Sequence, residues 1–226
     1  MNIIEMKGVK KDYPLGKTTV HALKQIDFSV EEGDFLSIVG PSGSGKTTLL
    51  NLIGCIDHAT EGSVVIHGTE VTTMSDKELT DLRLHRIGFI FQTFNLIPVL
   101  TVRENVEFPL LLMKKKNFSK HEIRKRTAEL IEEVGLSEQI EQKPYELSGG
   151  QRQRVAIARA LVTKPNIVLA DEPTANLDSE TGEKILGLMR ELNDVEKTTF
   201  IFSTHDPEVL KYAKNVVKIK DGVIAG

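Results

Sequence analysis

The chain has 226 residues, enough for one large domain or for one domain with a subdomain. Hydrophobic residues make up 40% and charged residues 27%, and the net charge of −3 gives no overall attraction to nucleic acid or to an acidic membrane surface. The single cysteine, Cys55, excludes an intrachain disulfide, and its apolar neighbours favour burial. The first residues lack the apolar core of a signal peptide, and no apolar run reaches the ~20 residues of a membrane span.

The first half of the chain predicts strands that surround one glycine-rich loop and its helix. Apolar and polar residues alternate over residues 1 to 33, the period of half-buried antiparallel strands. Residues 35 to 39 predict a short buried strand, and a helix begins near Lys46. Residues 64 to 66 predict another strand. Ser75 and Glu78 have capping-box spacing and open a helix that runs to about His85, followed by a buried strand over residues 87 to 91.

Helices dominate residues 102 to 162, where Ser119 and Glu122 open a helix that Gly135 ends. Strands and helices then alternate, with strands expected at 166 to 172, 198 to 204 and 215 to 222. The intervening helices are expected at 180 to 194 and from Pro207 onward. We therefore predict an α/β fold with a mostly parallel core sheet, an antiparallel β layer and a helical insertion. We expect the chain to form a single domain, with a core of about 1–90 and 163–226 and a helical subdomain of about 91–162.

The stretch "GPSGSGKTTL", residues 40 to 49, joins the end of one predicted strand to the start of a helix and matches the pattern G-x-x-x-x-G-K-[ST]. Gly40, Gly43 and Gly45 permit backbone angles closed to other residues, so that successive N–H groups can point at an anion. The helix adds the positive end of its dipole. The predicted phosphate-binding residues are Gly40, Pro41, Ser42, Gly43, Ser44, Gly45, Lys46, Thr47 and Thr48.

Within this loop, Lys46 can reach the β- and γ-phosphates of a nucleotide, and the Thr47 hydroxyl can bind Mg²⁺. A second strand, "IVLADE", brings Asp171 and Glu172 to its carboxyl end. Asp171 is placed to contact the metal, and Glu172 to accept a proton from the attacking water.

The segment "LSGGQRQRVAIARAL", residues 147 to 161, predicts a second anion site. Ser148 is a natural N-cap, and the glycines after it leave the first N–H groups of the helix unobstructed. The candidate residues are Ser148, Gly149, Gly150 and Gln151. Two such devices with one phosphate loop can be two sites, or two halves of a site that a second copy completes.

With the phosphate loop, "LSGGQ" and "ADEPT", the whole chain resembles an ATP-binding-cassette (ABC) ATPase, which implies a P-loop NTPase core that binds ATP with Mg²⁺. In that family the signature segment, "LSGGQ", of one subunit closes on the ATP held by the other, so the resemblance implies a homodimer on ATP binding. It also implies that Tyr13 stacks on adenine, that Gln92 approaches Mg²⁺ and water, and that His205 hydrogen-bonds the γ-phosphate. Residues 176 to 178 fit the family's D-loop, although "ANLD" departs slightly from its commoner forms.

Longer stretches, such as "RIGFIFQTFNLIPVLTVRENVEFPLLL", resemble the ATPase subunits of lipoprotein-releasing and macrolide-export transporters. Cell-division regulators and peptide-resistance transporters share nearly the same pattern. The resemblance implies a separate integral membrane subunit that contacts Phe94 to Leu100, and a cytoplasmic protein at the inner face of the cell membrane. The alternative is an ATP-dependent regulator of cell-envelope enzymes that acts through a membrane partner without transport.

A chromosome-organising or DNA-repair ABC protein would carry a long coiled coil between Lys46 and Ser148. Only about a hundred residues lie there, without sustained heptads, so we expect no nucleic-acid partner. The basic stretch from Lys114 to Arg126 is expected to be a solvated face, with a contact to lipid headgroups or to an acidic partner as the alternative.

Overall fold

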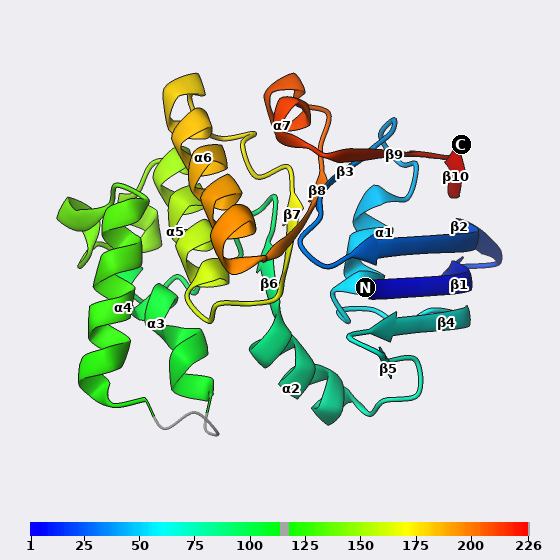
Figure 1. Ribbon diagram of the computed structural model, residues 1–226, viewed down its shortest axis with the longest axis horizontal. Helices are drawn as coiled ribbons and strands as arrows, with labels where there is room; N and C mark the ends of the chain where they lie inside the picture. The colour runs from blue at the N-terminus through cyan, green and yellow to red at the C-terminus, as the bar shows by residue number, and fades with distance from the viewer. Residues whose placement is uncertain (114–117, 226) are drawn as a thin grey trace.

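The computed structural model describes residues 1–113 and 118–225. Within these ranges the strands form two sheets, one antiparallel and one mostly parallel, and helices lie between and beside them (Figure 1). This arrangement confirms the α/β class, with its parallel core and antiparallel layer, that the alternation of elements predicted.

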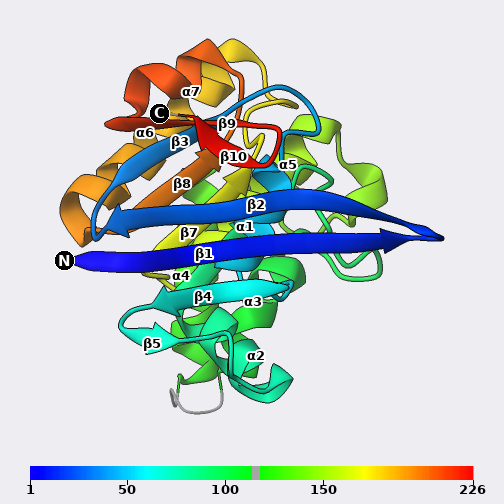
Figure 2. The same cartoon turned by 90° about the vertical axis from the view of Figure 1, so that its right-hand side faces the viewer.

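The antiparallel sheet has the strand order β2-β1-β4-β5 and is seen face-on in Figure 2. Its strands are β1 (Asn2–Leu15), β2 (Thr18–Glu31), β4 (Glu61–Ile66) and β5 (Thr69–Glu70). Alternate residues of β2 are buried, among them Ile26, Phe28 and Val30, as the sequence alternation predicted.

The second sheet has the order β10-β9-β3-β8-β7-β6, and only β10 pairs antiparallel with its neighbour. Its strands are β3 (Phe35–Val39), β6 (Ile87–Ile90), β7 (Ile167–Asp171), β8 (Thr199–Ser203), β9 (Asn215–Lys220) and β10 (Val223–Ala225). β3, which leads directly into the phosphate loop, therefore lies between β8 and β9 in the sheet. These two neighbours come from the last part of the chain.

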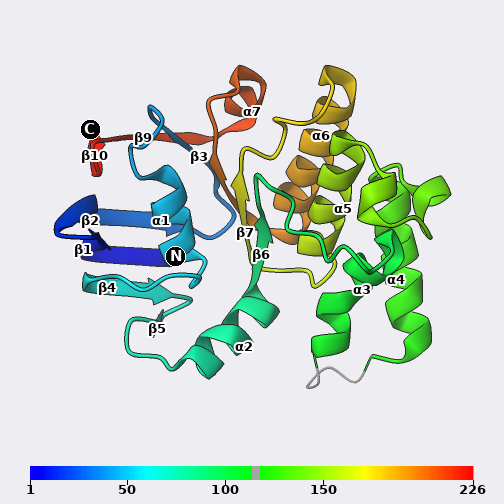
Figure 3. The same ribbon diagram turned by 180° about the vertical axis from the view of Figure 1, so that it is seen from behind.

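Both faces of the parallel sheet are buried, so its central strands are apolar throughout. Phe200 and Phe202 of β8 face one core, whereas Ile201 faces the other. The second core lies between the two sheets and contains α1 (Lys46–Ile53). The first core contains α3 (Val102–Leu112), α4 (Lys120–Glu133), α5 (Gly149–Leu161), α6 (Ser179–Glu196) and α7 (Pro207–Tyr212) (Figure 3).

Side-chain caps fix where most of these helices begin. Ser75 and Glu78 form the predicted capping box of α2 (Asp76–Arg86), and Ser119 and Glu122 form that of α4. Thr101 and Glu104 form a third capping box, with the same three-residue spacing, at the start of α3. Two short 3₁₀ helices, Ser137–Gln139 and Pro144–Glu146, lie between α4 and α5.

The helices α3 to α5 share the first core with the parallel sheet, so this core does not itself divide the chain. The division into a core and a helical subdomain stays a prediction. Residues 114–117 of the basic stretch lie outside the described residues. In the described part, Lys120, Arg124 and Lys125 are exposed, as a solvated face requires, while Arg126 is half-buried and burial lowers its pKa. No helix in residues 1–113 or 118–225 is long and apolar enough to span a membrane.

Candidate active site

A groove of about 880 Å³ opens at the carboxyl ends of β3, β7 and β8. Carboxyl ends of parallel strands are where ligands bind in open α/β sheets. The groove is lined by Val20, His21, Ala22, Lys24, Gly40, Pro41, Ser42, Gly43, Gly45, Lys46, Thr47, Thr48, Gln92, Asp171, Glu172, Ser203, His205, Asp221 and Gly222. The fold therefore brings the phosphate loop, the two acids, Gln92 and His205 to one site.

Two glycines of the phosphate loop are required for different reasons. Gly45 has a φ of +107°, and a Cβ there would lie 2.8 Å from the carbonyl oxygen of Ala22. Gly40 does not have a positive φ, but a Cβ there would lie 2.1 Å from the carbonyl oxygen of Ile219 in β9. The expectation that Gly40 supplies an unusual backbone angle is therefore wrong, because close packing against β9 is what excludes a side chain.

The first turn of α1 is left open for an anion. Gly45 is its N-cap and provides no side-chain hydrogen bond, whereas α2, α3, α4 and α5 all begin with a capping box. The Lys46 ammonium donates to the carbonyl oxygens of Gly40 and Pro41, at 2.8 and 3.0 Å, and so lies over the loop. A phosphate in this loop would meet a cation and uncapped N–H groups together.

The Thr47 hydroxyl donates to Asp171 Oδ2 at 2.9 Å, which joins the loop to the end of β7. A hydroxyl and a carboxylate are the hard oxygen ligands that Mg²⁺ prefers, and Gln92 lines the same groove. Among the described residues no group of three His, Cys, Asp or Glu side chains could hold a metal by itself. The donor set therefore fits a magnesium ion that completes its coordination with phosphate oxygens and water.

Glu172 stands directly after β7 with a positive φ of 49°, and its N–H donates to the carbonyl oxygen of Ser203 in β8. The Thr204 hydroxyl donates to Glu172 Oε2 at 3.0 Å. His205 Nδ1 lies 2.6 Å from Oε1, and because a carboxylate only accepts, Nδ1 carries the proton of this bond. Two donors therefore fix the carboxylate at the groove, and its role as a general base stays a prediction.

The site also contains residues that were not predicted from the sequence: Ser203, Thr204, and Asp221 and Gly222 of a turn. Thr204 could have been found from the sequence, because it directly precedes the predicted site residue His205. The buried Ser203 hydroxyl lines the groove without a hydrogen-bond partner in the described part of the chain. Asp221 and Gly222 follow β9, which pairs with β3, and the Gly222 N–H donates to the carbonyl oxygen of Ser44 in the phosphate loop at 3.1 Å.

Tyr13 is not one of the groove residues, but it pairs across the strands with Val20, which is one. Directly opposite residues of an antiparallel pair project to the same side of the sheet. The phenol donates to Asp57 Oδ2 at 2.7 Å. Burial and this hydrogen bond raise the pKa of Tyr13 above its usual range, and a smaller opposing effect comes from a hydrogen bond with the Thr48 side chain. The stacking of Tyr13 on adenine stays a prediction.

The signature segment, residues 147 to 151, lies outside the groove that holds the phosphate loop. Ser148 caps α5 as predicted: its hydroxyl accepts from Gln151 N–H at 3.2 Å, and Gln151 Oε1 accepts from Ser148 N–H at 2.8 Å. Ser148 is exposed. Asp178 of the predicted D-loop caps α6 through the Thr181 N–H at 3.0 Å. Within one copy of the chain, the two predicted anion-binding elements therefore do not share one groove.

Comparison with known proteins matches residues 23–175 to the family model described as ABC transporter. The chain is 48% identical to the uncharacterized ABC transporter ATP-binding protein MJ0796 of Methanocaldococcus jannaschii, over 98% of this chain and 95% of that protein. It is 47% identical to the macrolide export ATP-binding/permease protein MacB of Mannheimia succiniciproducens, over 99% of this chain but 34% of that protein.

A solved dimeric structure of the MJ0796 cassette, in a post-hydrolysis state bound to ADP and Pi, superposes on this chain with a TM-score of 0.96. The two are 46% identical, over 99% of this chain and 97% of the other. The family model covers the phosphate loop, Gln92 and Glu172, whereas the relatives extend over nearly the whole chain, including the part of the groove after β7. The chain is therefore an ATPase that belongs to the ABC transporter ATP-binding family.

Proposed function

We propose that this ATPase dimerises around two ATP molecules and drives a separate membrane subunit of the lipoprotein-release or drug- and peptide-export type. The observation that carries the proposal is the separation of the signature segment from the groove of its own chain. The phosphate-loop helix has no side-chain cap, and Ser148 is exposed outside the groove. This arrangement is consistent with two half-sites that meet across a dimer.

In the proposed site, the phosphate-loop N–H groups and Lys46 hold the β- and γ-phosphates. Thr47, Asp171 and Gln92 would hold Mg²⁺, which neutralises charge on the transferring phosphoryl group when bound. Glu172, fixed by Thr204 and His205, accepts a proton from the attacking water. His205 keeps its Nε2 available because Nδ1 is bonded to Glu172, which suits a contact with the γ-phosphate.

The dimer is supported by the relatives, since two solved structures of the MJ0796 cassette are described as dimeric. The membrane subunit is supported by the MacB proteins, whose names join ATP-binding and permease functions and of which this chain matches about a third. We place the protein at the inner face of the membrane through that subunit.

Residues 94 to 100, here called the docking segment, are proposed to contact the membrane subunit. Phe94 and Asn95 have positive φ angles of 62° and 49°, and their carbonyl oxygens accept from Arg159 of α5. Burial lowers the pKa of this guanidinium to about 10. The Arg152 guanidinium also lies 5.3 Å from the centre of the Phe94 ring. The helix that begins at the signature segment thus holds the docking segment at two points, Arg152 and Arg159.

The Ser148→Arg variant tests whether the signature segment acts on a second copy. A long cation at this exposed position should block closure on a partner while leaving the chain's own phosphate loop intact. We expect ATP binding by the monomer to persist and ATPase activity to fall at least about 10²-fold, the scale for lost transition-state contacts. Light scattering with ATP measures the dimer. Dimerisation as tight as wild type would contradict the proposal.

The docking segment is tested by two substitutions that separate packing from contact. Val99 is 70% exposed, whereas Leu96 packs against the first core. Val99→Asp should weaken co-purification with the membrane subunit and leave the melting temperature and basal hydrolysis unchanged. Leu96→Asp should lower the melting temperature as well, because it removes apolar packing and places a charge at a partly buried position. Retention of the membrane subunit by Val99→Asp would exclude this residue from the interface.

Transport is separated from regulation by identifying the partner. We expect the native complex to contain an integral membrane protein, and reconstituted vesicles of that complex to move or release a substrate only with hydrolysable ATP. A complex that alters the activity of cell-envelope enzymes without moving any substrate would favour the regulatory alternative.

A further inference from the structure

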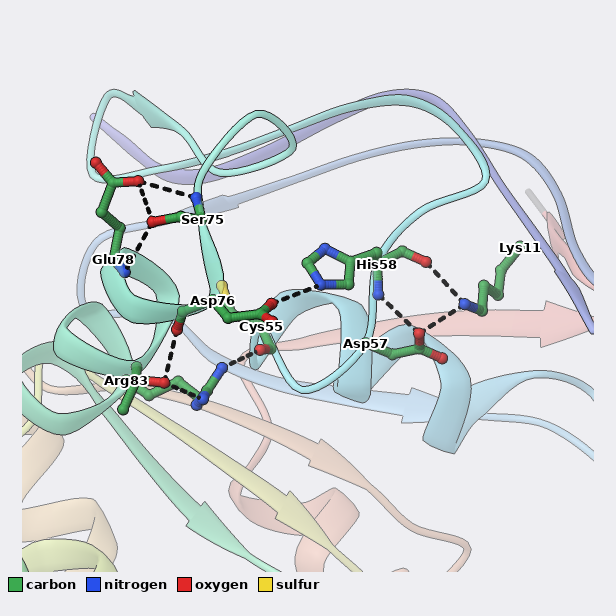
Figure 4. A network of polar contacts seen from close by, with 9 residues as sticks. Lys11, Cys55, Asp57, His58, Ser75, Asp76, Glu78 and Arg83 are labelled. Atoms are coloured by element: carbon green, nitrogen blue, oxygen red, sulfur yellow. Dashed lines mark hydrogen bonds and ion pairs between the residues drawn. The ribbon is translucent and has the colours of Figure 1, made fainter.

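Asp57 joins the end of the phosphate-loop helix to the strand that carries Tyr13. It lies four residues after the end of α1, its N–H donates back to the carbonyl oxygen of Asn51 in that helix, and its carboxylate accepts three hydrogen bonds. The Tyr13 hydroxyl donates to Oδ2 at 2.7 Å, and Lys11 and the His58 N–H donate to Oδ1 at 2.6 and 2.7 Å. Figure 4 shows Lys11 and His58 converging on this carboxylate.

Lys11 also covers the Tyr13 ring. Its ammonium lies 4.8 Å from the ring centre and donates in addition to the His58 carbonyl oxygen at 2.9 Å. Only 12% of the Lys11 side chain is exposed. A cation in this position occupies one face of the ring, so a flat ligand that stacks on this half-buried side chain must use the opposite face.

The segment that carries Asp57 is anchored from its other side by α2. Arg83 donates to the carbonyl oxygen of Cys55, and His58 Nε2 lies 3.5 Å from Asp76 Oδ1 (Figure 4). Partial burial works to raise the pKa of the Asp57 carboxyl, but the hydrogen bonds from Lys11, Tyr13 and the His58 N–H outweigh it and hold this pKa below its usual range. The carboxylate is therefore a fixed, charged acceptor.

We propose that Asp57 is a positioning residue for base recognition, which holds the Tyr13 ring against Lys11 so that the free ring face receives the adenine of ATP. The inference rests on the proposed function, which assigns adenine stacking to Tyr13. Tyr13 stands near the turn of the β1–β2 hairpin, where an untethered side chain would lose rotamer freedom on stacking. A tether made before binding removes that loss, and the affinity for the base rises.

The test compares a ligand with a base and one without. Calorimetry with Mg-ATP and with Mg-tripolyphosphate separates base contacts from phosphate contacts in the same protein. Tyr13→Ala should weaken ATP by about 5- to 150-fold, the range for loss of one base–aromatic stack, and change tripolyphosphate binding by less than about twofold. ATP binding unchanged by Tyr13→Ala would remove Tyr13 from the proposed site.

Asp57→Ala should weaken ATP by about 2- to 10-fold, the range for ordering one side chain, again with little effect on tripolyphosphate. Tyr13→Phe, which keeps the ring and removes the tether, should reproduce this loss. In the Tyr13→Ala background, Asp57→Ala should have no further effect on ATP. Asp76→Ala is the matched control, because it removes an exposed carboxylate from the same network without touching Tyr13.

The inference is overturned if Tyr13→Ala weakens ATP but Asp57→Ala and Tyr13→Phe do not. It is also overturned if Asp57→Ala weakens both ligands equally, or weakens ATP as much when Tyr13 is already alanine. Those results would make Asp57 a support for the phosphate-loop helix alone, while adenine stacking by Tyr13 would stand.

Discussion

The Glu172→Gln variant is expected to lose ATP hydrolysis by about 10²- to 10⁴-fold, the usual contribution of a general base. Glutamine has the shape of glutamate and can still bond to the Thr204 hydroxyl, which both donates and accepts, and to His205. The substitution therefore removes the proton acceptor with little change in geometry. Steady-state phosphate release measures the effect, and hydrolysis at the wild-type rate would remove Glu172 from the mechanism.

The same variant is expected to accumulate as a dimer with ATP. Two like unit charges about 4 Å apart repel by about 4 kcal/mol at an effective dielectric near 20, before Mg²⁺ and Lys46 offset most of it. The neutral amide removes the repulsion between residue 172 and the γ-phosphate, and blocked hydrolysis prevents reopening. Size exclusion should show a dimer with ATP and a monomer with ADP. A variant that stays monomeric in ATP would count against the two-chain site.

Lys46→Ala is expected to abolish ATPase activity while the fold stays intact. Among residues 1–113 and 118–225, the Lys46 ammonium donates to two uncharged carbonyl oxygens of its own loop, so its loss leaves no charged partner unpaired there. A charge-assisted contact to phosphate is worth roughly twice a neutral one, and it is strengthened as charge develops in the transition state. We expect wild-type melting behaviour with hydrolysis reduced at least about 10²-fold.

Lys24→Ala is the control for Lys46→Ala, since Lys24 lines the same groove from β2 but stands outside the phosphate loop. It should retain hydrolysis within a few-fold of wild type. Equal losses in the two variants would mean that the groove attracts nucleotide through its general positive charge. Near-wild-type turnover in Lys46→Ala would contradict the assignment of the phosphate loop.

The elements that local signals define were predictable from the sequence. Ser75, Ser119 and Ser148 each begin a helix because the cap and its partner lie three residues apart, within reach of one turn. Likewise, Asp171 ends β7 because the apolar run stops there. These signals placed the main site residues at the ends of the correct elements.

What the sequence did not reveal depends on residues far apart in the chain. The clash that requires Gly40 arises from Ile219, which reaches the loop only because β9 pairs with β3. The contact between Tyr13 and Asp57 depends on the end of α1 reaching β1. The order of strands in a sheet, and the side-chain contacts that this order creates, leave no short-range pattern in the sequence. These contacts could therefore be identified only in the folded structure.

The most direct test of the two-chain site mixes two inactive proteins, both carrying Glu172→Gln. One also carries Ser148→Arg, and the other also carries Lys46→Ala. In the mixture, the intact phosphate loop of the first can meet the intact signature segment of the second, whereas neither protein alone can form a complete site. The measurement is the molecular mass in solution, by analytical ultracentrifugation with ATP and Mg²⁺. We predict a dimer in the mixture and monomers in each separate sample. Monomers in the mixture, under conditions where Glu172→Gln alone dimerises, would contradict the account.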